Sequence, residues 1–174
     1  GAVVKVASLV MSETGGKVIL TATKSPSLGC GKVQPREVHK EYGTEKEKNI
    51  FKPIEGFWPA AAVECAKKHI SFDLIMFPTA YCELVTIGQI CHLTNGSQTL
   101  LVNFTPENDR YRLDRALAKS LLETGGYGAI VRMRCSQGVA VKQYHGHYMG
   151  TETQDMSLAS VQSSSNFVVD MQHE

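Results

Sequence analysis

Apolar residues follow two different patterns along the first 124 residues of the chain. In some segments they recur every three or four positions, as on one face of a helix, and in others they form short continuous runs, as in a buried strand. The two patterns alternate, which is typical of an α/β fold with a parallel sheet. They predict helices over residues 2–11, 57–69, 84–93 and 108–124, and strands over residues 17–23, 70–77 and 99–102.

The predicted helix over residues 108–124 shows the helical pattern most clearly. Asn108 and Asp109 are residues that cap helix N-termini, and Gly125 and Gly126 follow the last apolar residue of the pattern. We expect one apolar face of this helix to be turned inward. The residues on that face are Leu113, Ala116, Leu117, Leu121 and Leu122.

The pattern changes after Gly125. Two runs rich in β-branched and aromatic residues flank the short turn Ser136–Gly138, which predicts an antiparallel hairpin over residues 126–148. Alternation along the first strand places Arg132 and Arg134 on the same face. We therefore predict an α/β layer over residues 1–124 and antiparallel strands over residues 125–174.

The first predicted helix leads through Gly15–Gly16 directly into the strand over residues 17–23. A helix followed by a strand in this way is the second half of a βαβ unit. We therefore expect a further strand before residue 1, and a protein longer than this chain.

Composition and charge exclude several classes of function. The formal net charge of +1 leaves no dense basic surface for nucleic acid, and no apolar run reaches the ~20 residues that a membrane-spanning helix needs. The five cysteines are odd in number and form no CxxC pair, so we expect reduced thiols in a cytosolic protein. These cysteines are Cys30, Cys65, Cys82, Cys91 and Cys135.

Two kinds of ligand chemistry remain open in the sequence. His145 and His147 would share one face of a strand and could chelate a metal, and Asp73 interrupts an apolar strand where a carboxylate needs a partner. Further metal ligands at sensible spacing are absent, so packing histidines are the favoured interpretation and a metal-binding or hydrolase domain is the alternative. Arg132 and Arg134 could together bind one carboxylate-bearing ligand, or could pair with acidic residues of the chain itself.

Several motifs in order resemble the cargo-adaptor subunit of the COPII vesicle coat, the Sec24 class of the Sec23/Sec24 trunk family. The resemblance extends over nearly the whole chain. It rests on the runs 45–53, 64–66, 72–78 and 129–138, continued by 148–149 and 157–159. The sister GTPase-activating subunit matches less well around Arg132–Arg134.

This resemblance implies a von Willebrand A-like trunk domain over residues 1–124, followed by the first strands of a β-sandwich domain over residues 125–174. It implies a non-enzymatic adaptor without a cofactor in this chain, because the family's zinc finger lies outside it. The implied partners are the sister subunit in a heterodimer, the cytosolic tails of membrane cargo and SNAREs, and the surface of the endoplasmic reticulum (ER) membrane, but not nucleic acid.

The implied location is the cytoplasmic side of ER exit-site membranes and COPII vesicles, where the family selects cargo for transport to the Golgi. In the family, an Arg-x-Arg pair at the place of Arg132 and Arg134 helps to hold acidic sorting signals. One further alternative is an extracellular adhesion domain of the von Willebrand A type. Its support is limited to two glycosylation acceptor triplets, at Asn95 and Asn103.

Overall fold

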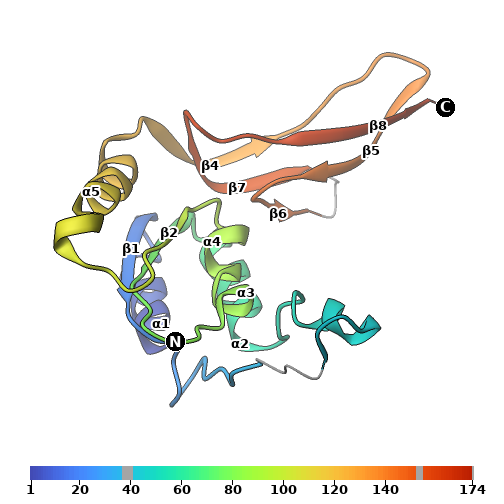
Figure 1. The fold of residues 1–174 in the computed structure, drawn as a ribbon. Coiled ribbons are helices and arrows are strands. Elements are labelled where there is room, and N and C mark those ends of the chain that lie inside the picture. The colour runs from blue at the N-terminus through green and yellow to red at the C-terminus, as the bar shows by residue number, and fades with distance from the viewer. Residues whose placement is uncertain (37–40, 152–154, 174) are drawn as a thin grey trace.

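The computed structural model describes residues 1–36, 41–151 and 155–173. A three-stranded parallel sheet forms the centre of the first part of the chain, with strand order β1-β2-β3 (Figure 1). The α/β layer predicted from the alternating patterns is therefore confirmed. The strands are β1 (Gly16–Ala22), β2 (Ile70–Met76) and β3 (Gln98–Leu100).

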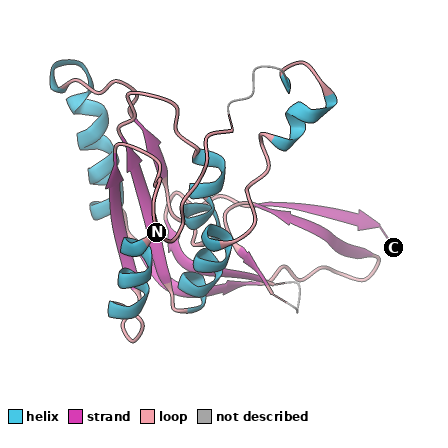
Figure 2. Cartoon of the chain, turned by 90° about the horizontal axis from the view of Figure 1, so that it is seen from below, coloured by secondary structure: helices cyan, strands magenta, loops and turns pink. Residues whose placement is uncertain are grey.

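Helices cover both faces of this sheet (Figure 2). Helices α1 and α2 lie on one face and α5 lies on the other, where the carbonyl of Ser120 accepts a hydrogen bond from Lys17 of β1 at 3.2 Å. The helices are α1 (Ala2–Val10), α2 (Phe57–Lys67), α3 (Leu84–Ile87), α4 (Gln89–Leu93) and α5 (Pro106–Leu122), with a short 3-10 helix at Glu45–Asn49. No helix in the described part of the chain is long and apolar enough to cross a membrane.

Every residue of β2 is buried, as its nearly continuous apolar sequence predicts. Phe72 and Leu74 pack into the core under α1 and α2, whereas Asp73 lies on the opposite face. The Asp73 carboxylate accepts a hydrogen bond from the Ser97 amide at 2.6 Å and lies 3.2 Å from the ammonium of Lys17, an ion pair without hydrogen-bond geometry. Its partners are therefore groups of the chain itself.

The long segment between β1 and α2 is fastened to the α/β layer by Arg36. Its guanidinium binds both oxygens of the buried Glu83 carboxylate, at 3.1 and 2.6 Å, and also donates to the Lys52 carbonyl at 2.7 Å. Glu83 in turn caps α3 by accepting from the Thr86 amide. Residues 37–40 of this segment lie outside the described residues.

The second part of the chain is antiparallel, but the predicted hairpin is wrong. Strand β4 pairs with β7, not with β5, and β5 pairs with β8. The residues between β4 and β5 begin as an irregular stretch over 132–135. The turn predicted at Ser136–Gly138 is present, since the Val139 amide donates to the Ser136 carbonyl at 3.2 Å and Gly138 has a positive φ of 88°, but it does not pair β4 with β5. The strands are β4 (Gly125–Val131), β5 (Val139–His145), β6 (Met149–Gly150), β7 (Met156–Gln162) and β8 (Val168–His173).

The helix before β4 also differs from its prediction. Its N-cap is Thr105, and Pro106 occupies the first turn, so Asn108 and Asp109 lie inside the helix. Leu113, Ala116 and Leu117 are half-buried as expected, but Leu121 and Leu122 are exposed because Ser120 is the residue of the last turn that faces the sheet.

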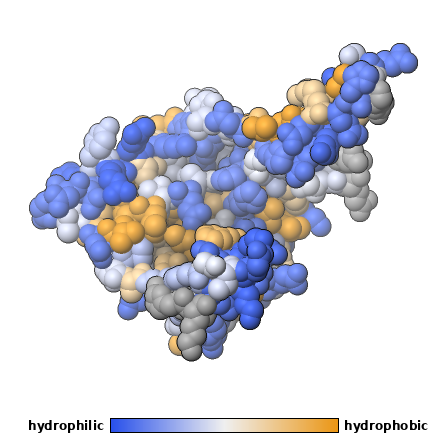
Figure 3. Space-filling view, turned by 45° about the vertical axis from the view of Figure 1, so that its right-hand side comes forward, coloured by the Kyte–Doolittle hydropathy of each residue, from blue (hydrophilic) through white to orange (hydrophobic). Residues whose placement is uncertain are grey.

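The two parts of the chain meet where β7 packs on the α/β layer. Met156 and Leu158 of β7 are fully buried, and the Asn95 side chain donates to the Ser160 carbonyl at 2.6 Å. The Ser160 hydroxyl donates back to the Asn95 carbonyl at 3.3 Å. Strands β5 and β8 project from the body as an arm, whose outer end is mostly hydrophilic (Figures 1 and 3).

Candidate peptide-binding site

Arg132 lies beside Asp155 because of the register between β4 and β7. The last pair of this antiparallel ladder is Val131 with Met156. Arg132 directly follows Val131, and Asp155 directly precedes Met156, so both lie just beyond this end of the ladder. The Arg132 Nε atom donates to Asp155 Oδ1 at 2.7 Å, and Nη2 donates to Oδ2. The Asp155 side chain is 7% exposed and that of Arg132 is 55% exposed. A buried carboxylate thus holds a half-exposed guanidinium in one orientation.

The backbone of Asp155 is itself fixed by Thr151. The Asp155 amide donates to the Thr151 hydroxyl at 3.1 Å, and this hydroxyl donates to the Asp155 carbonyl at 3.1 Å. The hydrogen bond to Asp155 raises the pKa of Arg132 above its ordinary value. Arg132 is therefore a charged, preoriented donor whose charge is balanced by a neighbour.

Arg134 differs from Arg132 in this respect. It is exposed, and among residues 1–36, 41–151 and 155–173 no acidic side chain forms an ion pair with it. The prediction that both arginines share one face assumed a continuous strand, but β4 ends at Val131. The two residues therefore lie in the irregular stretch that follows β4, and Arg134 supplies the unbalanced positive charge of this site.

Tyr144 of β5 lines a hollow together with Arg132. Its hydroxyl accepts a hydrogen bond from the Met133 amide at 3.2 Å, and its carbonyl accepts from the Tyr148 hydroxyl at 3.0 Å. A shallow hollow of about 330 Å³ lies on the Arg132 side of Tyr144, and a second of about 250 Å³ lies on the Tyr148 side. Val139, Ala140 and Val141 contribute apolar lining to the first hollow. Apolar groups beside the fixed Arg132 guanidinium suit a peptide that carries an acidic residue.

Sequence reasoning identified neither Asp155 nor Tyr144 as part of this site. Asp155 is 23 residues from Arg132 in the sequence. Their contact depends on the pairing of β4 with β7, which the alternation within each strand does not specify. A local sequence signal for these two residues is therefore lacking.

The structure does not bring together the residues of the alternative metal site. His145 pairs with Asp170 at 2.9 Å, and Asp73 lies in the parallel sheet with Lys17. His147 packs its ring on that of His92, with centroids 4.7 Å apart. Burial and the neighbouring His147 lower the pKa of His92. In the part of the chain that the structure describes, no three His, Cys, Asp or Glu side chains lie close enough to hold a metal.

The two glycosylation acceptors lie in different environments. The Asn95 side chain is buried, and its amide nitrogen is bound to the Ser160 carbonyl and the Ser165 hydroxyl. A glycan cannot be attached to this nitrogen in the folded chain. Asn103 is exposed and has a positive φ of 51°.

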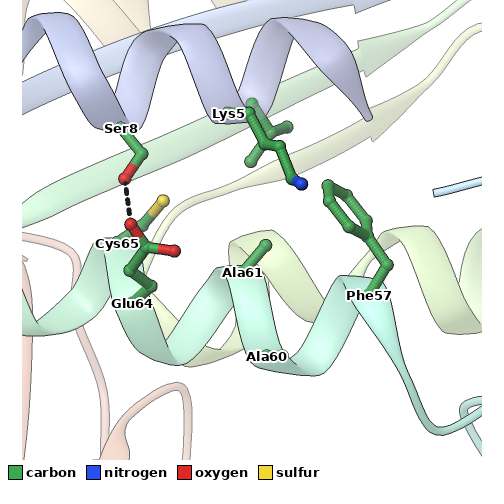
Figure 4. A pocket seen from close by; sticks show the side chains of 8 residues that line it. Lys5, Ser8, Phe57, Ala60, Ala61, Glu64 and Cys65 are labelled. Atoms are coloured by element: carbon green, nitrogen blue, oxygen red, sulfur yellow. Dashed lines mark hydrogen bonds between the residues drawn. The ribbon is translucent and has the colours of Figure 1, made fainter. Parts of the chain in front are cut away.

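A further hollow of about 250 Å³ lies between α1 and α2 (Figure 4). Lys5 points toward the ring of Phe57, 5.7 Å from its centroid, and Ser8 donates to Glu64 at 2.9 Å. Glu64 also accepts from Lys68 at 2.7 Å, and these hydrogen bonds, that from Lys68 first, lower the pKa of Glu64. The polar groups around this hollow are already paired with one another.

Comparisons with known proteins agree on one family. The chain is 30% identical over 168 residues to "Protein transport protein Sec24C" of Homo sapiens, and 27% identical over 173 residues to "Protein transport protein SEC24" of Dictyostelium discoideum. These matches cover 96% and 98% of this chain but only 15% and 17% of the two relatives. The chain therefore spans about one-sixth of the length of the curated relatives that it matches.

The fold agrees with these matches. The solved structure titled "Crystal structure of the human COPII-coat protein Sec24c" superposes with a TM-score of 0.94 at 28% identity, over 99% of this chain and 24% of that one. A family model described as "Sec23/Sec24 trunk domain" matches residues 1–121, more than half of the chain. The chain therefore belongs to the Sec23/Sec24 trunk family, among its Sec24-type members.

Proposed function

We propose that this chain is part of a Sec24-type adaptor of the COPII coat, a non-enzymatic protein that selects membrane cargo for transport from the ER to the Golgi. The observation that carries this proposal is the agreement of sequence and fold along almost the entire chain with human Sec24C. The printed names of the relatives describe protein transport, and the solved relative is described as a COPII-coat protein.

The proposed partners follow from the same family. They are a Sec23-type GTPase-activating subunit, which forms the other half of a heterodimer, and the cytosolic tails of membrane cargo and SNAREs. The protein would act at the cytoplasmic surface of ER exit sites and COPII vesicles, and it would use no cofactor within this chain. We also propose that the switch from parallel to antiparallel strands at Gly125 marks the border between a trunk domain over residues 1–124 and a β-sandwich domain over residues 125–174.

Within this function, we assign acidic sorting signals to Arg132 and Arg134. The ion pair with Asp155 fixes the Arg132 guanidinium, so this residue would contribute directed hydrogen bonds and little net charge. Arg134 would contribute the net charge that attracts a carboxylate. The hollow beside Tyr144 supports this assignment because it can hold the main chain and side chains that flank the acidic residue, with apolar contacts supplied by Val139–Val141.

The test is binding of an extended peptide with one central Glu to wild type, Arg132→Ala, Arg134→Ala and the double variant. Because Arg134 is exposed, we expect Arg134→Ala to weaken binding about twofold to fivefold at low salt, and less at physiological salt. Arg115→Ala is the matched control, because Arg115 is also exposed and lies on α5, away from the site.

Arg132→Ala also leaves the buried Asp155 carboxylate without this partner, so thermal unfolding must be measured alongside binding. A peptide with Gln in place of Glu should bind all variants equally weakly. If the Glu peptide binds the double variant as tightly as wild type at every salt concentration, the assignment of sorting signals to these arginines is wrong.

A further inference from the structure

A separate cleft lies between the α/β layer and the antiparallel strands. It has a volume of about 470 Å³ and shares no lining residue with the hollows beside Tyr144. We call it the junction cleft. It is lined by Asn95–Gln98, Lys119, Gly146–His147, Gln162 and Ser164–Asn166.

The charge of the junction cleft comes from Lys119, on the last turn of α5. No residue that lines the cleft is acidic, and in the described part of the chain no carboxylate forms an ion pair with Lys119. Glu123, one turn further along, is held by the Ser164 amide at 2.7 Å and the Ser163 hydroxyl at 3.0 Å. These hydrogen bonds lower the pKa of Glu123, so it remains ionised where it is. Lys119 is thus an exposed cation that forms no ion pair in the described part of the chain, although the Glu123 carboxylate, which is not part of the cleft lining, interacts with it electrostatically.

Ser165 supplies a second donor. Its hydroxyl oxygen accepts hydrogen bonds from the Asn95 side chain at 3.2 Å and from the Gln162 amide at 3.0 Å. Because a hydroxyl has two acceptor positions and one proton, both acceptor positions are used and the proton remains. Among the described residues, no acceptor for this proton is present. The Lys119 ammonium and the Ser165 hydroxyl are therefore hydrogen-bond donors, and they suit a ligand group that only accepts hydrogen bonds.

The floor of the cleft is held rigidly. Gln98 is exposed, but its carboxamide lies against Gly88, where a Cβ atom would be 2.7 Å from Gln98 Oε1. The floor at Gly96 lies directly on β2, since a Cβ atom there would be 1.8 Å from the Phe72 carbonyl oxygen. A preformed site loses less entropy when a ligand binds.

We propose that the junction cleft binds a carboxylate of an extended peptide. Lys119 and the Ser165 hydroxyl would bind the carboxylate, and the chain at Gly96 would form the floor beneath the peptide. A carboxylate is the peptide group that only accepts hydrogen bonds. This proposal does not depend on the assignment of Arg132 and Arg134, because the two sites have no residue in common.

The test uses the full chain and three N-acetylated tetrapeptides, followed by amide chemical shifts in NMR titrations. One is tetra-alanine with a free C-terminal carboxylate, the second is its C-terminal amide, and the third is an amide with Asp at the third position. We expect a carboxylate peptide to shift the amide signals of Gly96–Gln98 and Ser164–Asn166, and the tetra-alanine amide to bind at least about fivefold more weakly. Comparison of the first and third peptides shows whether a terminal or a side-chain carboxylate is preferred.

Lys119→Gln should reduce the affinity for the carboxylate peptides to that of the uncharged amide, and Lys119→Arg should restore most of it. Lys67→Gln is the matched control, because Lys67 is an exposed lysine on α2 and should have no effect. Equal binding of the acid and amide peptides, or shifts elsewhere in the chain, would overturn the proposal. The same holds if acetate alone binds as tightly as the peptides. Retained binding in the Arg132→Ala/Arg134→Ala double variant is expected, and separates this site from the sorting-signal site.

Discussion

At the scale of single residues, a buried carboxylate beside an arginine determines whether its guanidinium is held in place or remains unpaired. Arg36 and Arg132 each bind both oxygens of a buried acid, Glu83 or Asp155, and so hold one segment of the chain against another. Arg134 has no such acid among the described residues, although it is only two positions from Arg132. The sequence shows three arginines of equal charge, whereas the fold gives them different chemistry.

The pair formed by Arg36 and Glu83 allows a direct test of this reasoning. Glu83 is 2% exposed, so Arg36→Met would leave a buried charge without its main partner. We expect the free energy of unfolding to fall by about 2–4 kcal/mol in urea denaturation. The control is Arg112→Met, which breaks a pair with Asp109 at the helix surface and should cost less than about 0.5 kcal/mol. Equal losses in the two variants would contradict the expectation.

The pH dependence of stability checks the same pair. Burial raises the pKa of Glu83, but hydrogen bonds from Arg36, Tyr81 and Thr86 outweigh it, so the pKa lies below its ordinary value of 4.5. The stability that Glu83 contributes is therefore fully present above pH 4.5 and is lost as the pH falls through the lower folded-state pKa. In Glu83→Gln this part of the acid-induced loss of stability should disappear.

At the scale of elements, the sequence predicted those whose stabilising contacts follow a local pattern. The apolar run of β2 indicated a strand covered on both faces, and all of it is buried. The hairpin prediction was wrong because strand pairing is not determined locally. Strand β4 pairs with Met156–Gln162, which follows β5 in the sequence. The contact of Arg132 with Asp155 could not be predicted from the sequence for the same reason, because it depends on the pairing of β4 with β7. Leu121 and Leu122 follow the helical pattern, but in the last turn it is Ser120 that faces the sheet.

The connection from α4 to β3 offers a test at this scale. Gly96 passes so close to β2 that a Cβ atom would overlap the Phe72 carbonyl oxygen. This oxygen belongs to the backbone of a strand, so it cannot move aside by a side-chain rotation. We expect Gly96→Ala to lower the free energy of unfolding by more than about 2 kcal/mol. Gly150→Ala is the comparison, because its nearest atom is 3.9 Å away on the Tyr148 ring. A change of similar size in both variants would show that the close approach at Gly96 is easily relieved.

At the scale of the whole molecule, two kinds of sheet meet where β7 packs on the α/β layer, with Met156 and Leu158 buried. The parallel sheet has helices on both faces, whereas β5 and β8 form a two-stranded arm with Val168 and Met171 exposed (Figure 1). Asn95 and Ser160 join the two parts through reciprocal hydrogen bonds. The proposed sorting-signal residues, Arg132 and Arg134, lie on the connection between β4 and β5, and the junction cleft lies between the α/β layer and the antiparallel strands.

This arrangement predicts a gradient of local stability along the molecule. A two-stranded ribbon has little apolar surface to bury and opens more easily than a covered sheet. We expect amide hydrogens of β5 and β8 to exchange with solvent well before those of β1 and β2, as measured by hydrogen exchange with mass spectrometry. Equal protection in the two sheets would contradict the expectation.

The register between β4 and β7 determines which mutations can disrupt the proposed sorting-signal site. Val131 faces Met156 across the ladder, and Met156 and Leu158 are anchored in the hydrophobic core. A slip of one residue would carry Asp155 away from Arg132 and turn each side chain of β7 to the opposite face of the sheet. The position of Asp155, which balances the charge of Arg132, is thus set by the buried residues Met156 and Leu158. Genetic variants that impair recognition at this surface can therefore arise from changes deep inside the protein.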